Sequence, residues 1–161
     1  MEIVDVDLIP KVDDITDTPV GDLVELFAVA TRMAVTCHEE KGVGLSAVQV
    51  GIPWNFFVVK HQDGKFGFYV DCEYEPVEDV KSDSMEGCLS LRGGEGQLRM
   101  FRVERYQKVR VTGKKLVAED VPVLKDVDEE FDGFYGVVFQ HEIDHARGIL
   151  ISDFGKEVFV Y

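Results

Sequence analysis

A pair of histidines near the C-terminal end of the sequence constrains the fold more than any other feature. Residues 140–145 read Gln-His-Glu-Ile-Asp-His and contain the pattern His-Glu-x-x-His, with Gly148 where a helix would end. In a helix each residue turns the chain by about 100°, so His141 and His145 lie about 40° apart on one face. Two such imidazoles can bind one metal ion, and Glu142 can reach a water molecule on that ion as general base. The alternative is a helix with two solvated histidines.

A catalytic metal site usually has three protein ligands and one open position, so one ligand remains to be found. A metzincin would have a histidine where this chain has Ile151. A thermolysin-like protease would use a later glutamate, and here the only later one is Glu157, in an apolar segment. The upstream candidates are His38, His61, Cys37, Cys72 and Cys88. We favour Cys88, because it follows Gly87 in a segment predicted to be a loop.

The other four candidates have structural interpretations. The Thr-Pro pair at residues 18–19 predicts the start of an amphipathic helix that runs to about residue 40. Cys37 falls on the inner face of this helix, where free cysteines are commonly buried. His38 lies near the helix end and is expected to interact with the helix dipole. His61 and Cys72 are expected at the ends of strands.

The middle of the chain predicts antiparallel strands. Residues 55–60 and 66–70 are expected to form a hairpin about the Asp-Gly pair at residues 63–64. Residues 109–111 and 116–117 are expected to form two further strands about a turn between them.

Several polar or acidic segments are expected to connect these elements. Residues 73–83 are predicted to be a connecting or edge segment, residues 86–96 loops, and residues 126–132 a solvated loop before the histidine-bearing helix. Residues 2–9 are expected to form a short strand or an extended arm. The glycine-containing stretch 42–51 follows a helix and lacks Gly-Lys-Ser/Thr, which argues against a phosphate-binding loop.

Composition limits the class of protein. The 161 residues suit a single domain spanning residues 1–161. Three cysteines without a Cys-x-x-Cys pattern favour a reducing compartment. The apolar runs are too short for a transmembrane helix and the N-terminus is acidic, unlike a signal peptide, so we expect a cytoplasmic protein. The formal net charge of −14 argues against nucleic acid or an anionic membrane as a partner.

Three motifs, in order and with similar spacing, make the chain resemble the peptide deformylase family over most of its length. Residues 42–49 read Gly-Val-Gly-Leu-Ser-Ala-Val-Gln, residues 86–90 read Glu-Gly-Cys-Leu-Ser, and residues 140–145 complete the set. The family pattern is Gly-x-Gly-Leu-Ala-Ala-x-Gln, then Glu-Gly-Cys-Leu-Ser, then Gln-His-Glu-x-Asp-His. Ser46 departs from the first motif, an Asn-Pro pair is absent near Cys72, and the segment after the helix is short.

The resemblance implies one divalent metal ion held by Cys88, His141 and His145, with ferrous iron as the expected native ion. Zinc, nickel and cobalt also suit a thiolate and two imidazoles. The implied reaction is removal of the N-formyl group from formyl-methionine at the start of nascent peptides. Metal-bound hydroxide would attack the formyl carbon, with Glu142 as general base and then acid.

The resemblance also assigns roles around the metal. Gln49, which from its residue type alone either satisfies a core partner or points into a site, would stabilise the oxyanion together with the Leu89 backbone N–H. Asp144 either positions a neighbouring histidine or arginine or lies on a polar helix face. The residues expected to bind or position the substrate are Val43, Gly44, Glu86, Gly87 and Val138.

The expected fold is α+β, with antiparallel β-sheets packed around the central metal-binding helix and the N-terminal helix outside. We expect a monomer that acts on N-formylmethionyl peptides. Its net charge and short segment after the metal helix predict weak or absent ribosome association. Two alternatives stay open: a metallopeptidase or amidase that acts on another N-acyl group, and a metal-stabilised binding module without catalysis.

Overall fold

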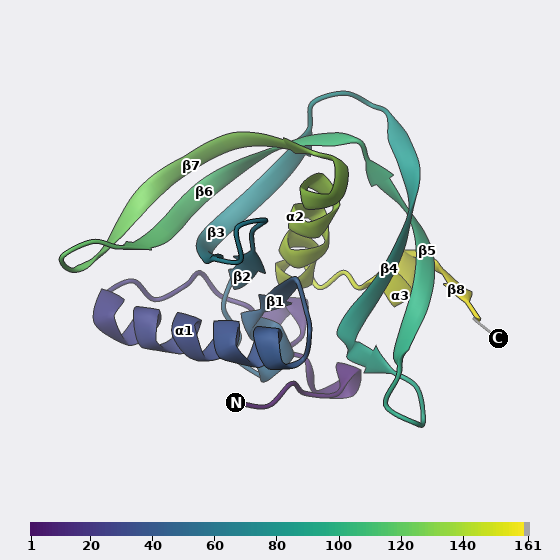
Figure 1. Ribbon diagram of the computed structural model, residues 1–161, viewed down its shortest axis with the longest axis horizontal. Coiled ribbons are helices and arrows are strands. Elements are labelled where there is room, and N and C mark those ends of the chain that lie inside the picture. Colours follow the sequence, from purple (N-terminus) through teal and green to yellow (C-terminus); the bar gives the residue numbers. More distant parts are fainter. Residues whose placement is uncertain (160–161) are drawn as a thin grey trace.

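Two antiparallel sheets lie on either side of a central helix in the computed structural model, which describes residues 1–159 (Figure 1). The five-stranded sheet has the order β1-β2-β3-β6-β7, formed by β1 (Gly44–Ser46), β2 (Phe56–Lys60), β3 (Phe66–Pro76), β6 (Lys108–Ala118) and β7 (Pro122–Asp132). The second sheet has the order β4-β5-β8, formed by β4 (Lys81–Arg92), β5 (Leu98–Tyr106) and β8 (Lys156–Val158). The helices are α1 (Leu23–Glu39), α2 (Gly133–Ala146) and α3 (Ile151–Phe154), with 3-10 turns η1 (Val6–Leu8), η2 (Val12–Asp14) and η3 (Ala47–Val50).

The five-stranded sheet is covered on both faces, and β2 shows how. Phe56 and Val58 pack into the cluster that contains α1, whereas the alternate residues Phe57 and Val59 pack into the cluster that contains Phe139 of α2. Side chains of a strand point to opposite faces in turn, so one apolar strand serves two cores. The α+β fold with α2 inside and α1 outside is therefore confirmed (Figure 1).

Helix α1 begins later than the sequence predicts. Its N-cap is Asp22, whose Oδ1 accepts the backbone N–H groups of the two residues that follow Leu23. Thr18 is instead buried, where its N–H donates to Asp71 Oδ1 at 2.8 Å and its hydroxyl donates to the Asn55 carbonyl at 2.8 Å. The prediction that Thr18 caps the helix was wrong, but the prediction that Cys37 is buried is confirmed.

Strands β3 and β6 are longer than expected because a bulge lets them continue past Cys72. The register between them shifts between Val70 and Glu73. Opposite the bulge, Gly113 has φ +153°, and a Cβ on it would lie 2.6 Å from Cys72 Sγ. The predicted turn at residues 112–115 was therefore wrong: it is the middle of one unbroken strand.

Three polar segments expected to be loops or connections form strands or parts of strands. Residues 73–83 end β3 and begin β4. The acidic run 126–132 lies in β7 because it faces basic residues of β6: Arg110 donates twice to Asp128 at 2.7 Å. Residues 86–92 belong to β4, so Cys88 lies on a strand. Strand β5, which pairs with β4, was not foreseen.

None of the helices within residues 1–159 is long and apolar enough to span a membrane.

Candidate metal centre

Helix α2 has the boundaries that its sequence predicts. It follows directly on β7, and its last turn is closed by the Arg147 N–H, which bonds to the Asp144 carbonyl. Gly148 then takes φ +74°, a left-handed conformation that favours glycine after a helix. The helix buries His145 and leaves His141 at the edge of a cavity.

Strand β4 brings Cys88 against both histidines of α2. The Cys88 Sγ and one ring nitrogen from each of His141 and His145 all lie within 4.8 Å of one another. The distance from Cys88 Sγ to His145 Nε2 is 3.8 Å. Two ligands at about 2.1–2.3 Å from one ion in a tetrahedral arrangement lie about 3.6 Å apart, so the donor set fits a divalent cation.

The other candidate ligands lie elsewhere. Cys37 packs in the core with α1, and Cys72 lies at the bulge of β3. His38 contacts Lys60 Nζ at 3.2 Å. His61 contacts the hydroxyl of Tyr69 at 2.8 Å. Each has a partner that accounts for its position without a metal ion.

One carboxylate orients the ring of His141. Glu86 Oε1 lies 2.9 Å from His141 Nδ1, which leaves Nε2 for the cluster. Burial alone would raise the pKa of Glu86, but its hydrogen bonds with Arg105 and His141 outweigh this and hold the pKa at about 2. Burial likewise opposes protonation of His141, whereas hydrogen bonds to Cys88 and Glu86 raise its pKa to about 10 in the metal-free chain, so an ion that binds Nε2 displaces a proton from this ring.

Two buried side chains of the helix each keep one polar atom without a partner among residues 1–159. Glu142 Oε1 and His145 Nδ1 have no hydrogen-bond partner within the described part of the chain. Burial raises the pKa of Glu142 to about 7. Burial, reinforced by the positive charge of His141, lowers the pKa of His145 well below its usual value, so this ring is neutral. A neutral imidazole is the form that binds a metal, and an orphaned carboxylate oxygen suits a site that receives a further group.

The Glu142 side chain leaves no room for a side chain at residue 44. A Cβ on Gly44 would lie 2.6 Å from Glu142 Oε2, closer than any side chain permits. The first motif therefore packs its backbone directly on the carboxylate of the third motif.

Gln49 both satisfies a core partner and points into the site, the two alternatives that its residue type allowed. It is buried, and its Oε1 accepts the Ser46 N–H at 3.0 Å. Its Nε2 donates to Cys88 Sγ and to Ser90 Oγ, each at 3.3 Å. The amide is thus held in the core and aimed at the cluster.

A cavity of about 380 Å³ opens beside the cluster. It is lined by every residue expected to contact the substrate, namely Val43, Gly44, Glu86, Gly87 and Val138, and by Gln49, Leu89 and Glu142. Sequence reasoning missed five apolar lining residues, Met85, Leu98, Met100, Phe134 and Val137. The alternation of β5, in which Leu98 and Met100 point the same way, is the signal that could have found two of them.

Arg105 was also missed. It is only 4% exposed and bridges Glu86 and Asp144. In β5 it shares the buried face with Phe101 and Val103, whereas Arg102 and Glu104 are exposed, so the alternation of this strand is the signal that could have marked it.

Comparison with known proteins gives a consistent family. The family model described as polypeptide deformylase matches residues 9–158. A curated relative named peptide deformylase from Natranaerobius thermophilus is 32% identical over 142 residues, covering 88% of this chain and 83% of the relative. One from Halothermothrix orenii is 34% identical over 137 residues, covering 84% of this chain and 81% of the relative.

Solved structures agree. The crystal structure of peptide deformylase from Thermotoga maritima is similar with a TM-score of 0.76 and 28% identity, covering 95% of each chain. That of a probable peptide deformylase from synechococcus phage S-SSM7 is similar with a TM-score of 0.78 and 26% identity, covering 96% of this chain and 99% of the other.

Proposed function

Because the chain belongs to the peptide deformylase family, which removes the formyl group from nascent peptides, we propose that it works as a metal-dependent hydrolase. Cys88, His141 and His145 would hold the ion. The observation that carries this proposal is the cluster of one thiol and two ring nitrogens within 4.8 Å beside an unpartnered carboxylate oxygen. When bound, the ion would polarise the formyl oxygen and lower the pKa of a water molecule.

Ferrous iron is the proposed native ion, and the same donors suit zinc, nickel and cobalt. Glu86 would orient the His141 ring through the 2.9 Å contact to Nδ1, so that Nε2 faces the ion.

Glu142 is the proposed general base. It would accept a proton from the attacking water and pass it to the amine that leaves when the formyl C–N bond breaks. A carboxyl with a pKa of about 7 is well matched to proton transfer in both directions near neutral pH. Because Gly44 packs on this carboxylate, its position is fixed before substrate arrives.

The proposed oxyanion donors are the Gln49 side chain and the Leu89 backbone N–H. Both come from residues that line the cavity, and Gln49 is anchored through Ser46 and Ser90. Fixed donors aimed at the developing negative charge lower the barrier without reorganising.

The methionine side chain would occupy the apolar cavity. Val43 and Val138 line it, and Gly87 widens it, because a Cβ on Gly87 would lie 3.0 Å from Met100 Sδ. The peptide backbone would run beside Val43 and Gly44 at the open edge of β1, as an added strand.

Release of formate from formyl-Met-Ala-Ser by metal-loaded protein under oxygen-free conditions tests the proposal. We expect turnover by the wild type and its loss in Glu142→Ala. Turnover of acetyl-Met-Ala-Ser in place of the formyl peptide would indicate another amidase, and no formate with either iron or nickel would refute the proposal. The monomeric state, the cytoplasmic location and weak ribosome association stay predictions.

A further inference from the structure

The bulge in β4 that contains Cys88 interrupts the backbone pairing between β4 and β5. Pairing of β4 with β5 is regular up to Gly87, which faces Met100, and resumes at Arg92, which faces Leu98. Residues 88–91 of β4 therefore stand opposite a single residue of β5. Peptide groups in a bulge of this kind leave the regular ladder, so the Leu89 backbone needs another partner to hold it.

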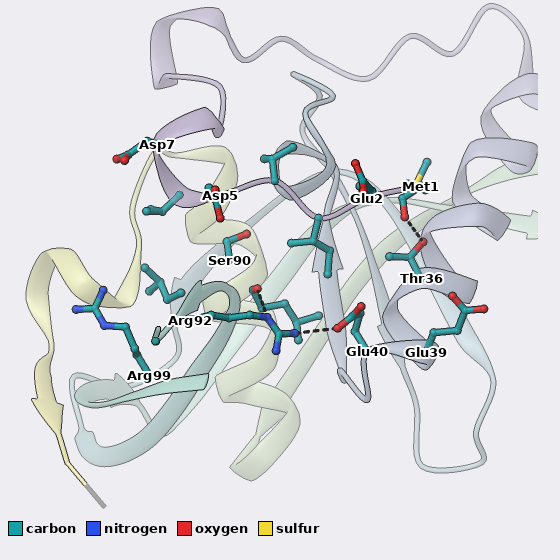
Figure 2. A pocket seen from close by; sticks show the side chains of 16 residues that line it. Met1, Glu2, Asp5, Asp7, Thr36, Glu39, Glu40, Ser90, Arg92 and Arg99 are labelled. Atoms are coloured by element: carbon teal, nitrogen blue, oxygen red, sulfur yellow. Dashed lines mark hydrogen bonds and ion pairs between the residues drawn. The ribbon is translucent and has the colours of Figure 1, made fainter. Parts of the chain in front are cut away.

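Arg92 supplies this partner from the end of the bulge. Its Nε donates to the Leu89 carbonyl at 3.1 Å, its Nη1 to the Gly96 carbonyl at 2.8 Å, and its Nη2 to the Glu40 carboxylate at 2.9 Å. Figure 2 shows Arg92 extended toward Glu40, with their ion pair drawn as a dashed line. One planar guanidinium thus joins the bulge, the hairpin tip and the end of α1.

These contacts also join the two walls of the substrate cavity. Glu40 is the C-cap of α1 and is followed by residues 41–44, which form one wall. Leu89 belongs to the other wall. Arg92 itself lines a second cavity, of about 490 Å³, and is absent from the lining of the first.

We propose that Arg92 is a positioning residue for the oxyanion donors, an inference that rests on the proposed function. By holding the Leu89 carbonyl, Arg92 fixes the backbone that presents the Leu89 N–H. Ser90, the next residue, accepts from Gln49 Nε2, so the same segment also holds the second donor. Loosening this segment moves both donors while His141 and His145 on α2 keep their places.

If Arg92 acted only in folding, its replacement would lower the melting temperature together with turnover. The Arg92 and Glu40 side chains are 34% and 47% exposed, and ion pairs at such sites contribute little to stability. The proposal therefore predicts a change in turnover without a matching change in the melting temperature.

The test is Arg92→Gln in the metal-loaded protein, with kcat and KM for formyl-Met-Ala-Ser. We expect kcat to fall about 10- to 100-fold, with KM, metal content and melting temperature nearly unchanged. Glu40→Gln should lower kcat less, because it weakens one of the three contacts. Arg99→Gln is the matched control. Arg99 lines the second cavity together with Arg92 but pairs with Glu157, at 2.9 and 3.0 Å, so this variant should leave kcat unchanged.

Backbone amide hydrogen exchange of residues 88–90 gives a second readout that needs no activity. Exchange should be about 10-fold faster in Arg92→Gln and unchanged in Arg99→Gln. Unchanged exchange in Arg92→Gln would overturn the proposal, and so would faster exchange with an unchanged kcat. A wild type that releases no formate would refute the proposed function, whereas faster exchange would still support the hold of Arg92 on Leu89.

Discussion

Arg105 on β5 forms a bidentate ion pair with Glu86 on β4, at 2.8 and 2.9 Å, and both side chains are almost completely buried. The same guanidinium donates to Asp144 of α2 at 2.7 Å, and the Tyr74 hydroxyl donates to the other oxygen of Asp144 at 2.8 Å. Glu86 in turn contacts His141. One buried cation thus connects the cysteine-bearing strand to the histidine-bearing helix.

Removing this cation should destabilise the protein strongly. Arg105→Gln leaves Glu86 and Asp144 buried and incompletely paired, and breaking one side of a buried ion pair costs about 3–5 kcal/mol. Urea unfolding measures the loss. Arg99→Gln, which breaks a partly exposed pair, should cost less than about 1 kcal/mol. Equal losses in the two variants would contradict a special role for the buried network.

Glu86 should make the protein sensitive to acid. Its pKa falls from 4.5 to about 2 on folding, although burial acts in the opposite direction. A depressed folded-state pKa stabilises the protein above the unfolded pKa, so this contribution is complete above about pH 5 and is lost as the pH falls toward 2. The shift corresponds to roughly 3 kcal/mol. Urea unfolding at pH 7 and pH 3 should show a smaller pH-dependent loss in Glu86→Gln than in the wild type, and parallel losses would contradict the assignment.

Gly44→Ala should reduce turnover by displacing Glu142. The added Cβ would meet the Glu142 carboxylate at 2.6 Å, and a displacement of about 1 Å at a catalytic group can cost about 100-fold in rate. Gly21→Ala is the control, because a Cβ on Gly21 meets nothing within 4 Å. The measurement is kcat for formate release, and an active Gly44→Ala variant would show that the carboxylate can move without loss.

Metal removal should lower stability through mass action. An ion present at 100 to 1,000 times its dissociation constant stabilises the folded state by about 3–4 kcal/mol, so a chelator should lower the melting temperature. Cys88→Ala should bind less metal and lose this response to the chelator. Cys37→Ala, which changes a buried cysteine away from the cluster, should keep it. The same metal content in both cysteine variants would argue against Cys88 as a ligand.

The sequence predicts the histidine-bearing helix well, since the i, i+4 spacing and a glycine at the end are local signals. It also predicts that Cys88 lies with the two histidines, although these residues are far apart in the chain. The loop expected around Cys88 is a bulged strand instead. A bulge and a glycine-containing loop look alike in sequence, because both use small residues where the backbone leaves a regular ladder.

The acidic strand β7 could not be predicted for a different reason. Asp126 and Asp128 are poor strand formers on their own, and Lys114 and Arg110 across the ladder compensate for them. The buried position of Arg105 depends on carboxylates from two other elements, Glu86 and Asp144. Local sequence patterns do not show which distant residues will be partners, so only the tertiary structure identifies them.

The unbroken β6–β7 ladder determines which way the side chains of α2 point. Its register is continuous from the pair of Ala118 with Pro122 to the pair of Lys108 with Asp132, and α2 starts at the next residue. Slippage of β7 by one residue would turn the helix by about 100° and swing both imidazoles away from the thiol. A one-residue insertion within β7 should therefore abolish metal binding, whereas the same insertion at residues 119–121, in the connecting turn, should be tolerated.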